Sequence, residues 1–175
     1  MKKLKNYLKL AVALLVLALP VVSVGKAFAA STGTVSATIT PQNISVSVSD
    51  GSVAYGTLGL SSSEDTTTAG VNDSQTATND GNVTEDFNIR STDATGGSAW
   101  TLGATPGADQ YAHSYCTSNC DASPTWNNMT TSYSSLATGV STSGNQLFDL
   151  QIETPTSSSD FVQKSITVTI QAVQN

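Results

Sequence analysis

Apolar and hydroxyl side chains alternate along much of this chain with a period of two. The alternation is clearest at residues 44–48 and 166–170, where every second side chain is Ile or Val and the rest are Ser or Thr. Shorter runs of the same kind occur at 35–39, 53–58, 87–89, 100–102, 111–115 and 148–152. A period of two is typical of half-buried antiparallel strands, whereas an amphipathic helix repeats every 3.6 residues. The pattern predicts an all-β fold of about eight strands, a single antiparallel two-sheet sandwich of immunoglobulin-like or jelly-roll type.

Turn residues separate the expected strands. Asp-Gly pairs stand at 50–51 and 80–81, and such pairs are hairpin signals. We therefore expect a tight turn at 49–52 to join strand 44–48 to strand 53–58. Two Ser/Thr-rich stretches without periodicity, 61–69 and 154–159, are predicted to be exposed loops.

The first 29 residues have the pattern of an export signal. A lysine-rich start and an apolar run precede Ala27-Phe28-Ala29, which places small residues where signal peptidase cleaves before Ala30. The alternative is a retained membrane anchor, but Pro and Lys interrupt a stretch that would need about 20 apolar residues. We expect residues 1–29 to be removed and residues 30–175 to form one secreted, cell-surface-associated domain without membrane contact.

Charge is distributed unevenly along the chain, which has a formal net charge of −6. After residue 29 the only basic residues are Arg90 and Lys164, against thirteen acids, so the mature chain would carry a charge of −11. Such a surface repels nucleic acid and anionic lipid. We therefore expect no nucleic-acid partner.

Several segments carry a resemblance to known proteins. The strand pair at 35–48, Tyr55-Gly56-Thr57-Leu58, Trp100-Thr101-Leu102 and the final Val/Ile/Thr strand resemble uncharacterised secreted β-sandwich surface proteins of candidate-phylum bacteria. The chain is also loosely similar to WxL cell-wall-binding domains and camelysin-type fibre proteins. It has one Trp-x-Leu, and its second tryptophan, Trp126, is followed by Asn. The resemblance implies a protein of the cell surface.

Two cysteines form the sharpest local feature. Cys116 and Cys120 are the only thiols of a chain that would enter an oxidising compartment, which predicts a disulfide between them. The alternative is a metal site, in which His113 and both cysteines have the spacing H-x2-C-x3-C and Asp121 is a fourth ligand. The disulfide is the favoured interpretation.

Carboxylates gather around the second Asp-Gly turn. Asp80, Glu85 and Asp86 form the densest cluster of oxygen ligands in the sequence, and Ca²⁺ prefers such ligands. Their spacing does not match an EF-hand loop. They are weak calcium candidates, and the alternative is a solvated turn. Calcium is the one cofactor that the sequence suggests.

Aromatic residues suggest a second kind of site. Trp126, Tyr111 and Tyr115 could offer flat apolar faces to sugar rings, with Trp126 in an exposed loop. Catalytic motifs are weaker, because the sequence has one histidine, His113, and no G-x-S-x-G elbow. We expect no catalytic residues and no enzymatic activity.

These features favour a structural or adhesive surface subunit that self-associates by strand addition. Residues 31–40 follow the cleavage site directly and alternate Val35, Ala37 and Ile39 with hydroxyl residues. Such a strand can pair within its own sheet or with the edge of a neighbouring subunit, and Pro41 provides an extended hinge for exchange. The alternative function is a carbohydrate or cell-wall binding module that uses Trp126 and the neighbouring tyrosines.

Overall fold

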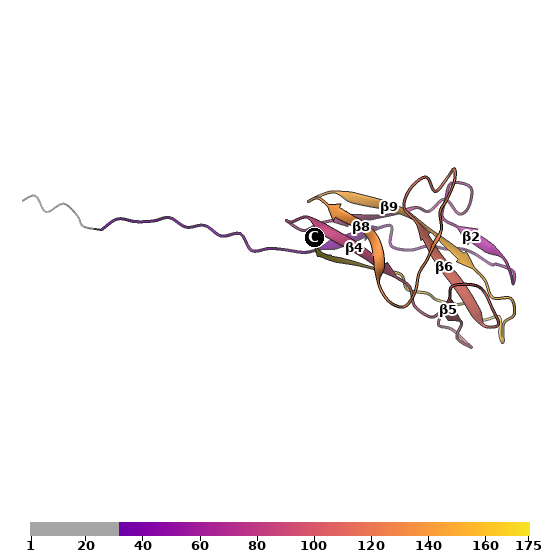
Figure 1. Ribbon diagram of the computed structural model, residues 1–175. Coiled ribbons are helices and arrows are strands. Elements are labelled where there is room, and N and C mark those ends of the chain that lie inside the picture. The colour runs from indigo at the N-terminus through magenta and orange to yellow at the C-terminus, as the bar shows by residue number, and fades with distance from the viewer. Residues whose placement is uncertain (1–31) are drawn as a thin grey trace, which may run out of the picture. The chain divides into compact units, whose positions relative to one another are not determined.

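The computed structural model describes residues 32–175, and every regular element in that range is a strand (Figure 1). Residues 40–175 form one compact unit, and residues 32–39 belong to a separate one. The expected export signal, 1–29, and its cleavage site before Ala30 lie outside the described residues. The prediction of an all-β chain is confirmed for the described part.

Ten strands make up two sheets in the described part of the chain. They are β1 (Val46–Ser49), β2 (Ser63–Asp65), β3 (Gln75–Asn79), β4 (Glu85–Arg90), β5 (Thr101–Gly103), β6 (Gln110–Cys116), β7 (Asn127–Asn128), β8 (Ser134–Val140), β9 (Asn145–Glu153) and β10 (Thr169–Gln174). The larger sheet has the order β1-β3-β9-β6-β5, with β2 paired to β9 and β7 to β6. The smaller sheet has the order β10-β4-β8. All pairs are antiparallel except β5 with β6.

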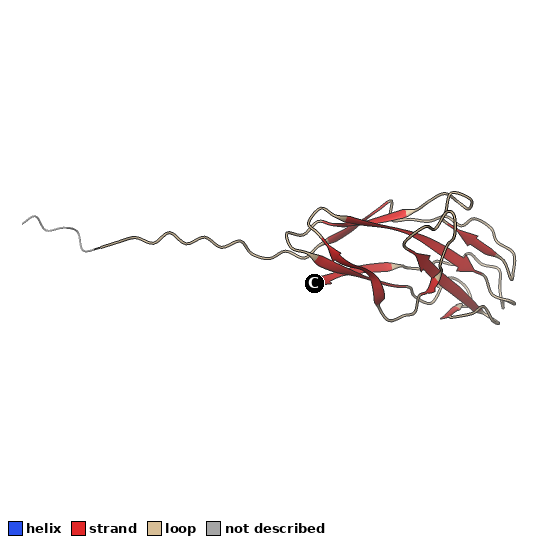
Figure 2. Cartoon of the chain, turned by 45° about the horizontal axis from the view of Figure 1, so that its top comes forward, coloured by secondary structure: helices blue, strands red, loops and turns tan. Residues whose placement is uncertain are grey.

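The two sheets face each other across a common core (Figure 2). Phe148 and Leu150 of β9 in the larger sheet pack in one cluster with Phe87 and Ile89 of β4 in the smaller sheet. All four side chains are buried. Burial of a side chain of this size contributes about 1.5–3 kcal/mol relative to leaving it in water, so these contacts hold the layers together.

The first Asp-Gly pair does not close the expected hairpin. Gly51 has a positive φ of 79° and turns the chain at the end of β1, but residues 53–58 form no strand. Instead, β1 pairs with β3, and the Gly51 N–H donates to Oε1 of Gln75 in β3 at 3.0 Å. The prediction of a strand at 53–58 is therefore wrong, because β1 pairs with β3 and not with the residues that follow the turn.

The second Asp-Gly pair lies in a crossover between sheets. It connects β3 in the larger sheet to β4 in the smaller one. Asn79 is fully buried there; its Oδ1 accepts from the Gly81 N–H at 2.8 Å, and its Nδ2 donates to the carbonyls of Val83 and Val140 at 2.8 and 2.9 Å. A side chain on Gly81 would collide with the Asn43 carbonyl, since an added Cβ would lie 2.5 Å from it. The crossover therefore requires asparagine at position 79 and glycine at position 81.

Candidate functional site

An open groove of about 1120 Å³ lies within the compact unit 40–175. The larger sheet lines it with Phe148, Leu150 and Ile152 of β9, and two non-strand stretches, 51–60 and 161–168, line it together with the start of β10. The groove therefore reaches the apolar interior between the two sheets. Aliphatic and aromatic residues make up somewhat more than half of its lining, and the rest are glycines and polar residues such as Gln75, His113 and Thr154.

The C-terminal wall of the groove bears an uncovered apolar row. Ile166, Val168 and Ile170 pack against the core yet remain only partly buried, whereas Thr167 between them is exposed. The alternation expected at 166–170 is therefore present, and the inner face is the expected one. The row is incompletely buried because it lines the groove, and Phe161 at the groove is 84% exposed.

The same wall ends in an edge strand. β10 pairs with β4 along one side, and its other side pairs with no strand in residues 32–175. In an antiparallel strand one residue directs its N–H and C=O toward the neighbouring strand on one side, and the next residue directs them toward the opposite side. The outer side of β10 therefore presents a row of backbone donors and acceptors that can accept a further strand.

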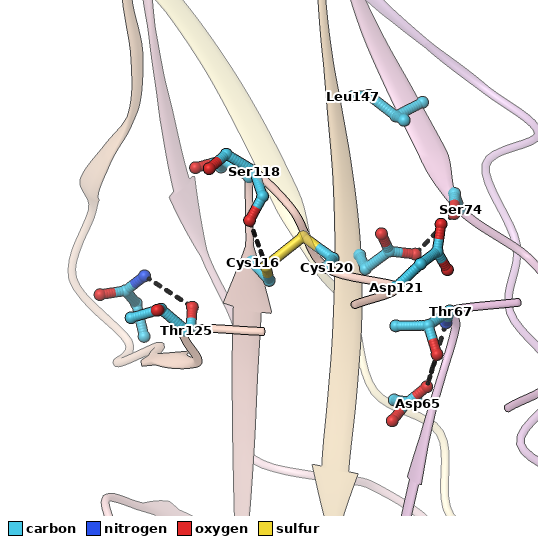
Figure 3. The surroundings of a disulfide bond; sticks show 12 residues. Asp65, Thr67, Ser74, Cys116, Ser118, Cys120, Asp121, Thr125 and Leu147 are labelled. Atoms are coloured by element: carbon cyan, nitrogen blue, oxygen red, sulfur yellow. Dashed lines mark hydrogen bonds between the residues drawn. A yellow bond between two sulfur atoms is a disulfide. The ribbon is translucent and has the colours of Figure 1, made fainter. Parts of the chain in front are cut away.

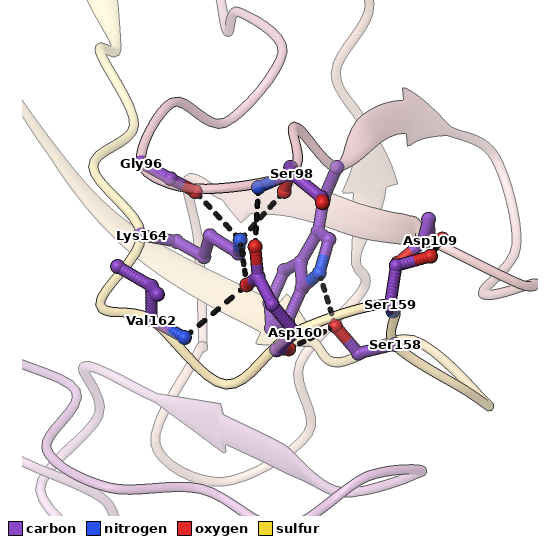
Figure 4. Close-up of polar contacts among 9 residues, drawn as sticks. Gly96, Ser98, Asp109, Ser158, Ser159, Asp160, Val162 and Lys164 are labelled. Atoms are coloured by element: carbon purple, nitrogen blue, oxygen red, sulfur yellow. Dashed lines mark hydrogen bonds and ion pairs between the residues drawn. The ribbon is translucent and has the colours of Figure 1, made fainter.

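Lys164, Asp160 and the loop at 96–98 form a hydrogen-bonded cluster, called the Lys164 bracket below (Figure 4). It holds residues 160–164 of the groove wall in place. Lys164 Nζ donates to the carbonyls of Gly96 and Ser98 and to Oδ1 of Asp160, each at 2.6 Å. Asp160 also accepts from the Ser98 and Val162 N–H groups. These hydrogen bonds, that from Lys164 above all, hold the pKa of Asp160 well below its usual range. No sequence motif predicts this bracket, because its members are two ordinary charged residues and backbone groups.

His113 of β6 lines the groove and is buried. Its Nδ1 lies 3.0 Å from Ser91 Oγ, and its Nε2 lies 3.2 Å from the Tyr55 hydroxyl. Burial lowers the pKa of this imidazole to about 4, so the ring is neutral at physiological pH. With both ring nitrogens occupied, His113 is a structural residue of the groove.

Cys116, the last residue of β6, is joined to Cys120 by a disulfide, as predicted (Figure 3). Because the two sulfurs are bonded to each other, the alternative metal site of His113 and two thiolates is not formed. Asp121, its expected fourth ligand, instead accepts a hydrogen bond from the Thr68 N–H at 2.7 Å.

The three calcium candidates are separated in the structure. Asp80 is exposed, whereas Glu85 is buried and accepts from the Ser45 N–H at 2.9 Å. Asp86, the next residue of β4, accepts from the Gly139 N–H and the Asn175 side chain. Consecutive residues of a strand point to opposite faces, so these two carboxylates cannot converge. Within residues 32–175, no group of three or more His, Cys, Asp or Glu side chains is placed to hold a metal ion.

The expected aromatic platform is not formed either. Tyr111 and Tyr115 are buried, and their hydroxyls donate to the carbonyls of Thr92 and Ser135. Trp126 is partly exposed. The prediction that the two tyrosines meet a ligand together with Trp126 is wrong, because β6 lies between β9 and β5 and both tyrosine rings are buried in the core.

The N-terminal segment 32–40 carries the second uncovered apolar row. Val35 and Ile39 are 93% and 92% exposed, and no residue from 32 to 45 belongs to a strand. The sequence predicted a strand here. The prediction of a strand at 35–39 is therefore wrong for the single chain, because this segment pairs with none of the residues that the structure describes.

Comparisons with known proteins give no match: no family model, no curated protein and no solved structure is similar to this chain. Among the described residues there is no helix of the length and apolarity that a membrane span requires.

Proposed function

We propose that this chain is a secreted, non-catalytic cell-surface protein, a structural or adhesive subunit with an immunoglobulin-like or jelly-roll sandwich, and that it self-associates by strand addition. One observation carries the proposal: an exposed apolar row at 32–40 occurs in the same chain as an open groove with apolar residues in its lining, beside an edge strand.

The energetics of exposed apolar side chains support association. Fully burying a Val or Ile side chain contributes about 1.5–3 kcal/mol, and Val35 and Ile39 are almost fully exposed in the single chain. The groove likewise leaves Phe161 exposed and Val168 half-buried. Strand addition would cover both surfaces at once and would satisfy the free backbone groups of an edge.

The non-catalytic part of the proposal is supported by the state of the titratable groups. His113 is the only histidine of the chain, and it is neutral, buried and hydrogen-bonded at both nitrogens. A general base has to reach the proton that it removes. His113 is engaged within the interior instead.

Sedimentation velocity of the exported protein tests the proposal. We expect species larger than the monomer that grow with protein concentration, and filaments or chains in negative-stain electron microscopy. A protein that sediments as a monomer at every concentration, and that binds isolated cell walls or glycans in that state, would contradict self-association and favour the binding module.

A further inference from the structure

We propose that the groove receives residues 32–40 of a second copy of this chain, which lie along the outer edge of β10 as a fourth strand of the smaller sheet. This inference rests on the proposed function and identifies its acceptor and its occupant. In the assembly, Val35, Ala37 and Ile39 of one copy would face the apolar lining of the next.

The two apolar rows have the same spacing. Val35, Ala37 and Ile39 lie two positions apart in the sequence, as do Ile166, Val168 and Ile170. A strand rises about 3.3 Å per residue, so both rows are about 13 Å long. Side chains on one face of neighbouring strands contact each other directly. A strand paired with the edge of β10 and its preceding residues would thus extend the wall of the groove by a matching row.

Of the two edge strands beside the groove, β10 is a better acceptor than β1. β1 is the terminal strand of the larger sheet, but it has four residues, and positive φ angles at Gly51 and Gly56 interrupt the extended backbone that follows it. β10 has six residues, and the groove-facing alternation continues before it to Ile166. Of these two edges, β10 therefore offers the longer one to an incoming strand, and β8, the other edge of the smaller sheet, does not line the groove.

Charge does not oppose this contact, although the chain as a whole is strongly acidic. Residues 32–40 contain no charged side chain, and Lys164 is the only charged residue among the described residues that line the groove. Like charges that face each other across an interface would cost free energy. Both partner surfaces are thus free of the acids that cover the rest of the molecule.

The anchoring of residues 41–45 favours exchange over insertion into the same chain. The Asn43 N–H donates to Oδ1 of Asn82 at 2.8 Å, Nδ2 of Asn82 donates to the Pro41 carbonyl at 2.9 Å, and the Ser45 N–H donates to Glu85. These bonds hold the chain against the crossover between β3 and β4. A residue before proline is restricted to extended backbone, so a tight reversal at Thr40 into the chain's own groove is disfavoured.

Disulfide trapping between two variants of the exported protein tests the inference. One variant carries Ala37→Cys, and the other carries Val168→Cys and a tag that changes its mass; Ile166→Cys and Ile170→Cys variants cover neighbouring registers. The native Cys116–Cys120 bond stays in place. After mixing and mild oxidation, we expect a covalent heterodimer with at least one of the three acceptor variants. Thr38→Cys, on the opposite face of the strand, is the matched control and should give several-fold less heterodimer.

The remaining outcomes separate this inference from the proposed function. Self-association without any groove cross-link would overturn the inference and leave strand addition at another edge. A variant that carries both Ala37→Cys and Val168→Cys addresses the remaining possibility. If it forms the cross-link within one chain and runs as a monomer, the segment fills its own groove and not that of a second copy. If the unmodified protein does not self-associate at all, both proposals fail.

Discussion

Asn79 shows how much the fold depends on single polar side chains. It is fully buried and satisfies the backbone of Gly81, Val83 and Val140 where the chain crosses between the sheets. We expect Asn79→Ala to lower the free energy of unfolding by about 3 kcal/mol, because it leaves buried backbone groups without partners. Urea denaturation measures this change. Asn127→Ala, at an exposed position of β7, is the control and should change stability by less than about 0.5 kcal/mol.

His113 makes stability depend on pH. Its pKa is about 4 in the folded protein and about 6.5 in the unfolded chain, so the unfolded chain binds more protons between these values. Stability should therefore fall as the pH decreases from 6.5 to 4, by up to about 3 kcal/mol from this residue. His113→Gln removes the titration and retains polar atoms toward Ser91 and Tyr55. Urea denaturation across this pH range should show a smaller loss in the variant; equal losses would contradict the buried neutral imidazole.

At the scale of the element, the segment 158–165 keeps its shape through Lys164. Lys164→Met removes three donated hydrogen bonds, so we expect the Ser98 and Val162 amides to exchange faster in hydrogen-exchange experiments, with little change in the strands. Arg90→Met is the control, since Arg90 lies over the Tyr133 ring and outside this bracket. Equal exchange in both variants would mean that the lysine does not hold the wall of the groove.

Strands were predictable where Val, Ile and aromatic residues alternate, as in β4 and β9. The strand predicted at 166–170 overlaps β10 (Thr169–Gln174) only at residues 169 and 170, although its apolar alternation is present. β3 was missed because its buried positions are Gln75, Ala77 and Asn79, which show no apolar alternation. The two polar side chains can be buried because they form hydrogen bonds. β8 was missed because its pairing with β4 is irregular and Gly139 has a positive φ. An Asp-Gly pair indicates a turn, but it does not specify the strand that pairs next.

The candidate site consists of the apolar row at 35–39 and the groove, and only the row could be predicted from the sequence. The row of Val35, Ala37 and Ile39 is visible as local alternation. The groove is not, because it depends on strand order, on the non-strand course of 53–58 and on the bracket at Lys164. Calcium and sugar sites were expected from residues that are neighbours in sequence, but strand geometry sends Glu85 and Asp86 to opposite faces.

At the scale of the whole molecule, the acidic surface opposes assembly. Residues 30–175 carry a formal net charge of −11, and like charges on two copies repel each other. Since the Debye length shortens from about 10 Å at 0.1 M salt to about 3 Å at 1 M, added NaCl should raise the weight-average sedimentation coefficient. At equal ionic strength CaCl₂ should act as NaCl does, because the expected calcium ligands do not converge. A large excess effect of calcium would instead reveal a bridging ion.

The most direct test of strand addition compares Ile39→Asp with Thr38→Asp by sedimentation velocity of the exported protein. Both variants add one charge to the same non-strand segment, one on the apolar row and one on the hydroxyl row. We predict that Ile39→Asp remains monomeric with an unchanged melting temperature, whereas Thr38→Asp assembles like the unmodified protein. Equal assembly of the two variants, or loss of folding in Ile39→Asp, would contradict the account.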